Sequence, residues 1–245
     1  MSSILSLLQS SSKAIAVLVD PEKFVKGDNF TFLQKLKIAQ PDFLFIGGST
    51  VTRKDFDACI EVLKSNCEIP LVIFPGASHQ IHEKADALLF LSLISGRNPD
   101  YLIGHHIQAA DELENMDIEI IPTSYLLIDG GKKTSVEYVS QTTPIPNDQA
   151  DIARKIALAG KLQGKKITYL DCGSGAHQTV STKMIQQVKS IGLPLIIGGG
   201  IRSIEKIQEL HSAGANVVVI GNKIEEDVDF LLDISNLQKE KNGAN

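Results

Sequence analysis

Two stretches near the carboxyl end decide the fold. Residues 195–203 read Leu-Ile-Ile-Gly-Gly-Gly-Ile-Arg-Ser, and residues 217–223 read Val-Val-Val-Ile-Gly-Asn-Lys. In each, a short continuous apolar run stops at glycine, which is typical of a strand buried on both faces of a parallel sheet. Glycine lets the backbone approach an anion closely, and successive N–H groups at a helix start favour phosphate. The pair therefore predicts a phosphate site; the alternative is that the glycines only make tight turns.

The same pattern recurs along the whole chain. Further apolar runs at residues 14–19, 43–46, 71–74, 88–91, 118–121 and 167–170 bring the expected strands to eight. Amphipathic stretches that predict helices lie at residues 30–39, 54–65, 103–114, 148–162, 182–191, 203–213 and 225–234. Eight such units in 245 residues predict an α/β protein, a (β/α)8 TIM barrel. The competing doubly wound sheet normally needs fewer strands.

Two connections depart from this regular alternation. Residues 75–86 are too short and too interrupted by glycine and proline for a full helix, so the third helix should be irregular or shortened. Residues 126–146 are too long for a simple turn and predict a flap over the barrel. Asp148 and Ser203 are expected helix N-caps. No change of composition divides the chain, so we expect one domain over residues 1–235 and a polar tail over residues 236–245.

Composition excludes several classes of protein. A formal net charge of −5 argues against a nucleic-acid partner, which normally requires a basic face. Cys59, Cys67 and Cys172 are odd in number and form no Cys-x-x-Cys pair, so a disulfide framework is not expected. Residues 1–12 lack the basic start of a secretory signal, and no apolar run is long enough to span a bilayer. The sequence thus predicts a soluble, cytoplasmic protein.

The positions directly after each strand give the candidate site, because chemistry in this fold lies at the carboxyl ends of the strands. Asp20 follows the first strand and could hold Mg²⁺ through one carboxylate oxygen, or it could be a helix cap or a salt-bridge partner. Ser49 could add a hydroxyl ligand or cap the next helix. A magnesium site at Asp20 and Ser49 is therefore one of two open interpretations.

Other chemistries have weaker support in the sequence. His79 and His82 lack a third ligand at a sensible spacing, and the adjacent His105 and His106 would point apart on a helix. Structural or surface roles are therefore expected for these histidines. A Schiff-base lysine should lie inside the barrel near a strand end, whereas residues 165–166 precede the sixth strand and lie at the opposite face.

A series of short segments lies at the expected mouth of the barrel: residues 19–23 (Val-Asp-Pro-Glu-Lys), 47–50 (Gly-Gly-Ser-Thr), 74–76 (Phe-Pro-Gly), 98–101 (Asn-Pro-Asp-Tyr), 169–176, 198–202 and 221–222. Together, these segments resemble the geranylgeranylglyceryl phosphate synthase family, which includes the bacterial heptaprenylglyceryl phosphate synthases. The resemblance extends from residue 14 to residue 227, and residues 123–143 look more like the archaeal-type branch.

The resemblance implies a Mg²⁺-dependent prenyltransferase that joins geranylgeranyl diphosphate, or a similar prenyl diphosphate, to the 3-hydroxyl of sn-glycerol 1-phosphate. The product would be an ether-lipid precursor, with diphosphate released. The family pattern places Mg²⁺ on Asp20 and Ser49. It also implies a homo-oligomer, and a lipid substrate and product predict transient contact with a membrane surface. The residues that it implies for glycerol phosphate are Tyr169, Leu170, Asp171, Cys172, Gly173, Ser174, Gly175, Gly199, Gly200, Gly221 and Asn222.

Two residues carry the most specific expectations of the resemblance. Asp171 stands where the family usually has glutamate; the carboxylate should bind the glycerol hydroxyls and take the proton from the attacking one. Because aspartate is one methylene shorter, either the substrate lies deeper or a water bridges the gap. Tyr101 is implied to close the far end of the prenyl groove and limit the chain length. The alternative is that Tyr101 is an ordinary core aromatic.

Two other functional classes stay open. Another phosphate-binding TIM-barrel enzyme, such as a sugar-phosphate isomerase or an FMN-dependent oxidoreductase, would share the glycine loops after strands seven and eight. A non-catalytic glycerol-phosphate or lipid-binding protein is favoured if Asp171 has lost its role. A dinucleotide site is disfavoured, because Gln178 stands where the third glycine of the pattern that begins at residues 173–175 should be.

Overall fold

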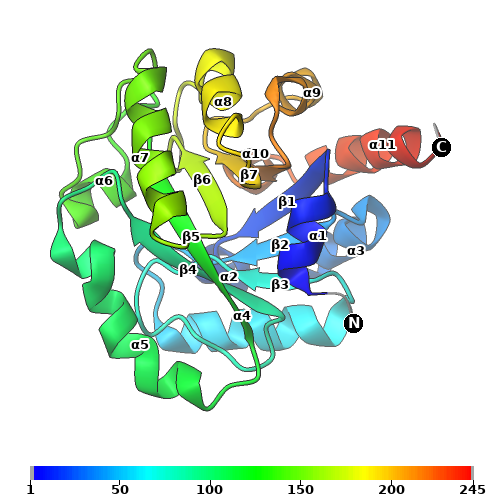
Figure 1. Ribbon diagram of the computed structural model, residues 1–245. Helices are drawn as coiled ribbons and strands as arrows, with labels where there is room; N and C mark the ends of the chain where they lie inside the picture. Colours follow the sequence, from blue (N-terminus) through cyan, green and yellow to red (C-terminus); the bar gives the residue numbers. More distant parts are fainter. Residues whose placement is uncertain (1–2, 244–245) are drawn as a thin grey trace.

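The structure, a computed structural model, describes residues 3–243, with side chains described as far as Gln238. Eight parallel strands pair in sequence order and close into a barrel, with β8 beside β1. This architecture confirms the predicted TIM barrel (Figure 1). The strands are β1 (Ala14–Val19), β2 (Phe43–Ile46), β3 (Leu71–Ile73), β4 (Ala87–Leu93), β5 (Glu119–Leu127), β6 (Ile167–Asp171), β7 (Leu195–Gly198) and β8 (Val217–Ile220).

Helices surround the barrel (Figure 1). The stretches expected at residues 30–39, 54–65, 103–114, 148–162, 182–191 and 203–213 are helical with small differences at the ends. In contrast, α1, α2, α6 and α10 were not expected, and the last expected helix, at residues 225–234, is displaced to α11. Ser203 caps α9 through a bond from the Lys206 N–H, as predicted. Asp148 does not cap α7, because the residue directly before that helix is Gln149. The helices are α1 (Ile4–Ser10), α2 (Pro21–Lys26), α3 (Asn29–Ala39), α4 (Arg53–Asn66), η1 (Asp100–Gly104), α5 (His105–Glu114), α6 (Ser135–Ser140), α7 (Ala150–Leu162), α8 (Thr182–Lys189), α9 (Ile204–Ala213), α10 (Asn222–Glu226) and α11 (Phe230–Gly243).

The apolar side chains form two cores, because successive residues of a strand point to opposite faces. Phe45 and Leu89 belong to the cluster inside the barrel, whereas Leu44 and Leu88 belong to the cluster between the barrel and the helices. The short helix α1 adds Leu8 to the inner cluster. Side chains therefore fill the barrel interior, and a site for substrate is left at the carboxyl ends of the strands.

The last helix corrects one expectation. Instead of a polar tail from residue 236, α11 continues to Gly243. It lies against α3, where the Ser235 hydroxyl donates to the Ile38 carbonyl oxygen at 3.0 Å. The buried Gln238 amide donates to the Asp42 carboxylate at 2.8 Å. These contacts hold a polar sequence in a helix that its composition did not predict, and residues 244–245 lie outside the described part of the chain.

Residues 74–86, which connect β3 and β4, form no helix. The third helix was expected to be irregular or shortened, and the structure has none at this position. The pairing there is also short: β3 and β4 share two residue pairs, whereas β4 and β5 share seven. In contrast, β5 is longer than expected: it was predicted to end at residue 121 and extends to Leu127. The wall of the barrel is therefore weakest between β3 and β4.

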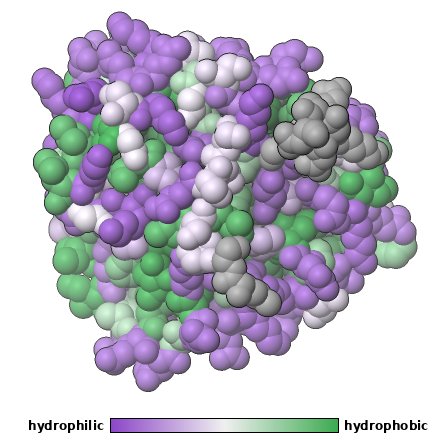
Figure 2. Space-filling model, turned by 45° about the vertical axis from the view of Figure 1, so that its right-hand side comes forward, coloured by the Kyte–Doolittle hydropathy of each residue, from purple (hydrophilic) through white to green (hydrophobic). Residues whose placement is uncertain are grey.

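The outer surface is largely hydrophilic on the face shown in Figure 2, with separate apolar patches. Ile103 near the end of η1 and Ile107 in the first turn of α5 are among the exposed apolar side chains. Within residues 3–243, no helix combines the length and the apolar character needed to cross a membrane.

Candidate active site

A cavity of about 390 Å³ occupies the carboxyl end of the barrel, a volume typical of small-molecule sites. The loops after β1, β2, β3, β6, β7 and β8 line it, together with residues of α5 and α6. The long connection after β5 contributes Ser135 and Val136 of α6, so it lies over the mouth as the predicted flap would. The expected site residues that line this cavity are Asp20, Ser49, Tyr101, Tyr169, Asp171, Gly173, Ser174, Gly175, Gly199, Gly200, Gly221 and Asn222.

Two expected substrate-binding residues, Leu170 and Cys172, do not line the cavity. Both are buried in the core between the barrel and the helices. They alternate with Tyr169 and Asp171, which point inward, so the pleat of the strand turns their side chains away. The side chains of Leu170 and Cys172 therefore face away from the cavity, and a role of these two residues in binding substrate stays a prediction.

The loop after β7 is shaped by glycine. Gly199 and Gly200 have φ values of +86° and +73°, a region that residues with a Cβ rarely adopt. A Cβ at Gly200 would also lie 2.5 Å from the Gln178 carbonyl oxygen. Gly221 differs: its φ is −121°, and a Cβ there would make an ordinary 3.4 Å contact with Leu18. Glycine is thus required by the fold at 199–200, whereas at 221 it keeps the cavity open.

The Asn222 side chain joins two of the loops that are expected to bind phosphate. Asn222 accepts through Oδ1 from the Gly175 N–H at 2.7 Å and from the Ser174 hydroxyl at 3.1 Å. Its Nδ2 donates to Glu225 at 3.1 Å, and Glu225 pairs with Lys23 at 2.6 Å. The loops after β6, β8 and β1 are therefore linked in series around the mouth.

Asp171 is the only carboxylate among the residues of the barrel strands that face this cavity in the described chain. Its side chain is 8% exposed; Oδ2 accepts from the Tyr125 hydroxyl at 2.7 Å and Oδ1 from the Gly173 N–H at 2.8 Å. Burial raises the pKa of Asp171, and these two hydrogen bonds oppose the rise by favouring the charged form. The arrangement gives a fixed carboxylate suited to accepting a bond from a substrate hydroxyl.

Asp20 and Ser49 lie at the same cavity, after β1 and β2. Asp20 is the N-cap of α2, and its Oδ1 accepts from the Glu22 N–H at 3.0 Å. Its Oδ2 faces Gly48, where an added Cβ would lie 3.4 Å away. The helix-cap interpretation of Asp20 is confirmed, because one oxygen caps α2. The metal-ligand interpretation stays a prediction, for which the second oxygen is the candidate ligand. A carboxylate oxygen with a nearby hydroxyl fits a partly hydrated Mg²⁺.

The cavity continues outward between β3 and β4 into an apolar groove. Leu88 and Phe90, which point out of the barrel, line it together with Ala109 of α5. His106 stacks on Phe90 with ring centroids 3.9 Å apart, and its Nε2 is within hydrogen-bonding distance, 2.6 Å, of the Leu91 carbonyl oxygen. Since a carbonyl can only accept, this Nε2 carries the proton.

Tyr101 and His105 line the same groove. Their rings meet edge to face with centroids 4.9 Å apart. Tyr101 belongs to η1, a π-helical turn, and turns of this kind frequently mark functional sites. Both ring nitrogens of His105 are buried without a hydrogen-bond partner in the described structure. This wall of the groove therefore combines the Tyr101 ring with an imidazole whose nitrogens have no hydrogen-bond partner among the described residues.

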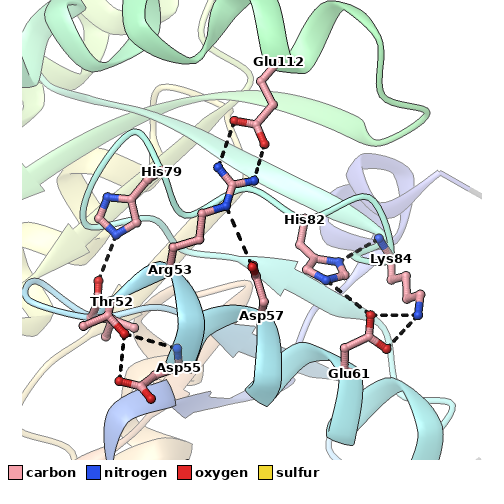
Figure 3. Close-up of polar contacts among 10 residues, drawn as sticks. Thr52, Arg53, Asp55, Asp57, Glu61, His79, His82, Lys84 and Glu112 are labelled. Carbon is pink, nitrogen blue, oxygen red and sulfur yellow. Dashed lines mark hydrogen bonds and ion pairs between the residues drawn. The ribbon is translucent and has the colours of Figure 1, made fainter.

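The connection between β3 and β4 is held by side chains rather than by a helix. The buried Gln80 accepts from the Gly76 N–H at 3.0 Å and donates to the Gly48 carbonyl oxygen at 2.7 Å. Figure 3 shows the outer attachments of this segment to α4, including the ion pair between Lys84 and Glu61. These contacts keep residues 75–86 in place as one wall of the groove.

Most of the chain matches the model of a protein family. The model of the PcrB family covers residues 11–238. The chain belongs to the PcrB family. It is 44% identical to geranylgeranylglyceryl phosphate synthase of Chitinophaga pinensis, covering 91% of this chain and 89% of the relative. It is 46% identical to the protein of the same name from Zunongwangia profunda, with 91% and 95% covered.

The chain is also similar to solved structures. The chain superposes on the crystal structure of (S)-3-O-geranylgeranylglyceryl phosphate synthase from Thermoplasma acidophilum in complex with its substrate sn-glycerol-1-phosphate. The TM-score is 0.88 at 31% sequence identity, and the match covers 96% of each chain. The resemblance of the mouth residues thus led to the right family.

Sequence reasoning missed several residues of the site in this PcrB-family chain. Tyr125 was assigned to a loop after a strand ending at residue 121, whereas it lies within β5 and points into the barrel. A run of β-formers through residues 123–127 could have extended that strand. Phe90 and Gln80 carried no motif at all, because their roles depend on the gap between β3 and β4.

Proposed function

We propose that this chain is a prenyltransferase that joins a prenyl diphosphate, such as geranylgeranyl diphosphate, to the 3-hydroxyl of sn-glycerol 1-phosphate. The observation that carries the proposal is one cavity with two different parts. Glycine loops after β6, β7 and β8 suit a phosphate, and the apolar groove between β3 and β4 suits a hydrocarbon chain. The names of the relatives and the glycerol phosphate in the Thermoplasma acidophilum structure support this assignment.

Asp171 would orient the glycerol and accept its proton. The glycerol oxygen forms a bond to the first carbon of the prenyl chain while the bond from that carbon to the diphosphate oxygen breaks. Diphosphate leaves with the bonding electrons, and the hydroxyl proton passes to the Asp171 carboxylate. Since Tyr125 and Gly173 already hold this carboxylate, it enters the reaction without further ordering.

Asp20 and Ser49 would hold Mg²⁺, with Oδ2 of Asp20 as the carboxylate ligand. When bound, the ion neutralises charge on the departing diphosphate and so assists cleavage of the allylic bond. The helix-capping role of Asp20 fixes the direction of its side chain. No group of three or more His, Cys, Asp or Glu side chains within the described residues forms a complete metal site, so the substrate itself would complete this one.

The groove would bind the prenyl chain and exclude water from the reacting carbon. Each buried methylene contributes up to about 0.8 kcal/mol, so a long chain gains affinity from this wall alone. Tyr101, backed by the His105 ring, would set the length of chain that fits. A C20 donor is the expected preference.

The proposal extends to membrane contact, cellular location and oligomeric state. Ile103 and Ile107 are exposed where η1 and α5 meet, beside the residues that line the groove, and this placement supports transient contact with a membrane surface. The cysteines of the described chain are all unpaired, which supports a reducing, cytoplasmic location. We also propose that the chain forms a homo-oligomer, as its family resemblance implies.

Turnover of radiolabelled geranylgeranyl diphosphate with sn-glycerol 1-phosphate and Mg²⁺ tests the function directly. A labelled ether product that requires both substrates and disappears with EDTA is the expected result. A purified protein with a flavin spectrum and no such product would favour an FMN enzyme instead. Binding of both ligands without turnover would indicate a carrier protein.

A further inference from the structure

The Asp171 carboxylate has an uncommon charge environment. The carboxylate is buried, and burial raises its pKa. The Tyr125 hydroxyl and the Gly173 N–H lower the pKa, and no cation contributes to the shift. Burying a carboxylate without a cation is costly unless hydrogen-bond donors replace water. Among the described residues, the Tyr125 hydroxyl is the one side-chain donor to this carboxylate.

The ring of Tyr125 is fixed by its neighbours. It meets Tyr169 edge to face with centroids 5.6 Å apart and Phe74 at 5.8 Å, while Phe74 and Tyr169 stack at 5.0 Å. The register of β5 and β6 places Tyr125 beside Tyr169, and the next inward residue of β6 is Asp171. Three rings therefore direct one hydroxyl to one carboxylate oxygen.

We propose that Tyr125 is a positioning residue for the prenyl transfer: its hydroxyl holds Asp171 ionised and turned so that the remaining oxygen lone pairs face the cavity. This inference rests on the proposed function and adds a residue to its machinery. A carboxylate can accept about four hydrogen bonds, of which the protein supplies two here. The substrate hydroxyls would use the rest.

The groups near Asp171 allow a clean measurement of this link. Tyr125 faces it from β5, Tyr169 from its own strand, and Cys172 follows it, while β7 presents Gly198. Burial raises the pKa of both tyrosines and of the cysteine, so all three stay neutral while a carboxyl group titrates. A change in the titration of Asp171 after loss of the Tyr125 hydroxyl would therefore report the hydrogen bond itself.

The first test is a double-mutant cycle on binding, measured by calorimetry with sn-glycerol 1-phosphate and the full chain. Tyr125→Phe keeps the ring and removes the hydroxyl. We expect it to weaken binding at least about fivefold in the parent, and less than about twofold in the Asp171→Ala background. Equal losses in both backgrounds would mean that Tyr125 contacts substrate directly, and no loss in the parent would overturn the proposal. Tyr138→Phe, the same change at an exposed ring, is the matched control.

The second test needs no substrate. In the full chain labelled with ¹³C-aspartate, the Asp171 carboxyl resonance is assigned by its disappearance in Asp171→Ala. Tyr125→Phe should raise the pKa of Asp171, because it removes a bond that favours the charged form. An unchanged titration would contradict the proposal even if the protein is active. If the parent neither binds sn-glycerol 1-phosphate nor turns over, the proposed function fails while this titration still decides the link between the two side chains.

Discussion

On the β6–β8 side of the mouth, the backbone gives the loops their shape. Gly173, Gly199 and Gly200 all adopt positive φ, and a Cβ at any of them would approach other atoms within 3.0 Å. On the β3–β4 side, side chains determine the shape instead. Gln80 anchors the connection, and Phe90 with His106 forms the wall of the groove. A phosphate needs a close ring of N–H groups, whereas a hydrocarbon chain needs only apolar surface of the right length.

The largest expected effect concerns Asp20, which lies at the mouth between these two sides. Asp20→Asn should lower the turnover rate at least about a hundredfold, because a neutral amide is a far poorer Mg²⁺ ligand than a carboxylate. The fold should survive, since asparagine is as good an N-cap as aspartate and can keep the bond to the Glu22 N–H. Steady-state rates over a range of Mg²⁺ concentrations, with thermal unfolding as the control, measure this. Parent-like turnover and Mg²⁺ dependence would remove Asp20 from the metal site.

The second prediction concerns Gly221 and compares the effects of one substitution on the KM values of the two substrates. Gly221→Ala should raise the KM for sn-glycerol 1-phosphate about tenfold and leave the KM for prenyl diphosphate nearly unchanged, because the added methyl blocks backbone approach only at the phosphate. The contact with Leu18 is an ordinary one, so stability should hold.

Gly200→Ala is the companion variant for that experiment. Its Cβ would lie 2.5 Å from the Gln178 carbonyl oxygen, so it should lower Tm as well as affinity. If Gly221→Ala instead raised both KM values equally, the phosphate would have to bind elsewhere.

The same contrast explains what the sequence could predict. Glycines after apolar runs locate the loops that are expected to bind phosphate, because few other residues adopt the positive φ found at Gly199 and Gly200. Asp20 was found because it stands at a strand end, whereas the role of Asp171 was predicted through the family resemblance. Tyr125 was misplaced because its strand extends past Pro122, a residue that normally ends one. The groove wall was not predictable, since Phe90 and Gln80 acquire their roles only when β3 and β4 pair over two residues.

The third prediction concerns the apolar side alone. Tyr101→Ala should shift the preference between C20 and C35 donors several-fold toward the longer one, because removing a rigid ring opens space that packed walls would not yield. Tyr101→Phe keeps the ring and should keep the parent preference. Competition between the two donors measures the ratio, and KM for sn-glycerol 1-phosphate should stay constant. An unchanged ratio in a folded Tyr101→Ala protein would make Tyr101 a core aromatic and nothing more.

The smallest expected effects compare two attachments of the β3–β4 connection. Gln80→Leu removes a buried amide and leaves the Gly76 N–H and the Gly48 carbonyl oxygen unpaired, which should cost about 1–3 kcal/mol of stability. Lys84→Met breaks the ion pair with Glu61, which is exposed on both sides, and should leave Tm within error because such pairs are screened by water. Thermal unfolding of both variants decides between buried and surface anchoring. A larger loss from Lys84→Met than from Gln80→Leu would show that this wall of the groove is held from outside, and the contrast drawn between the two sides of the mouth would then be wrong.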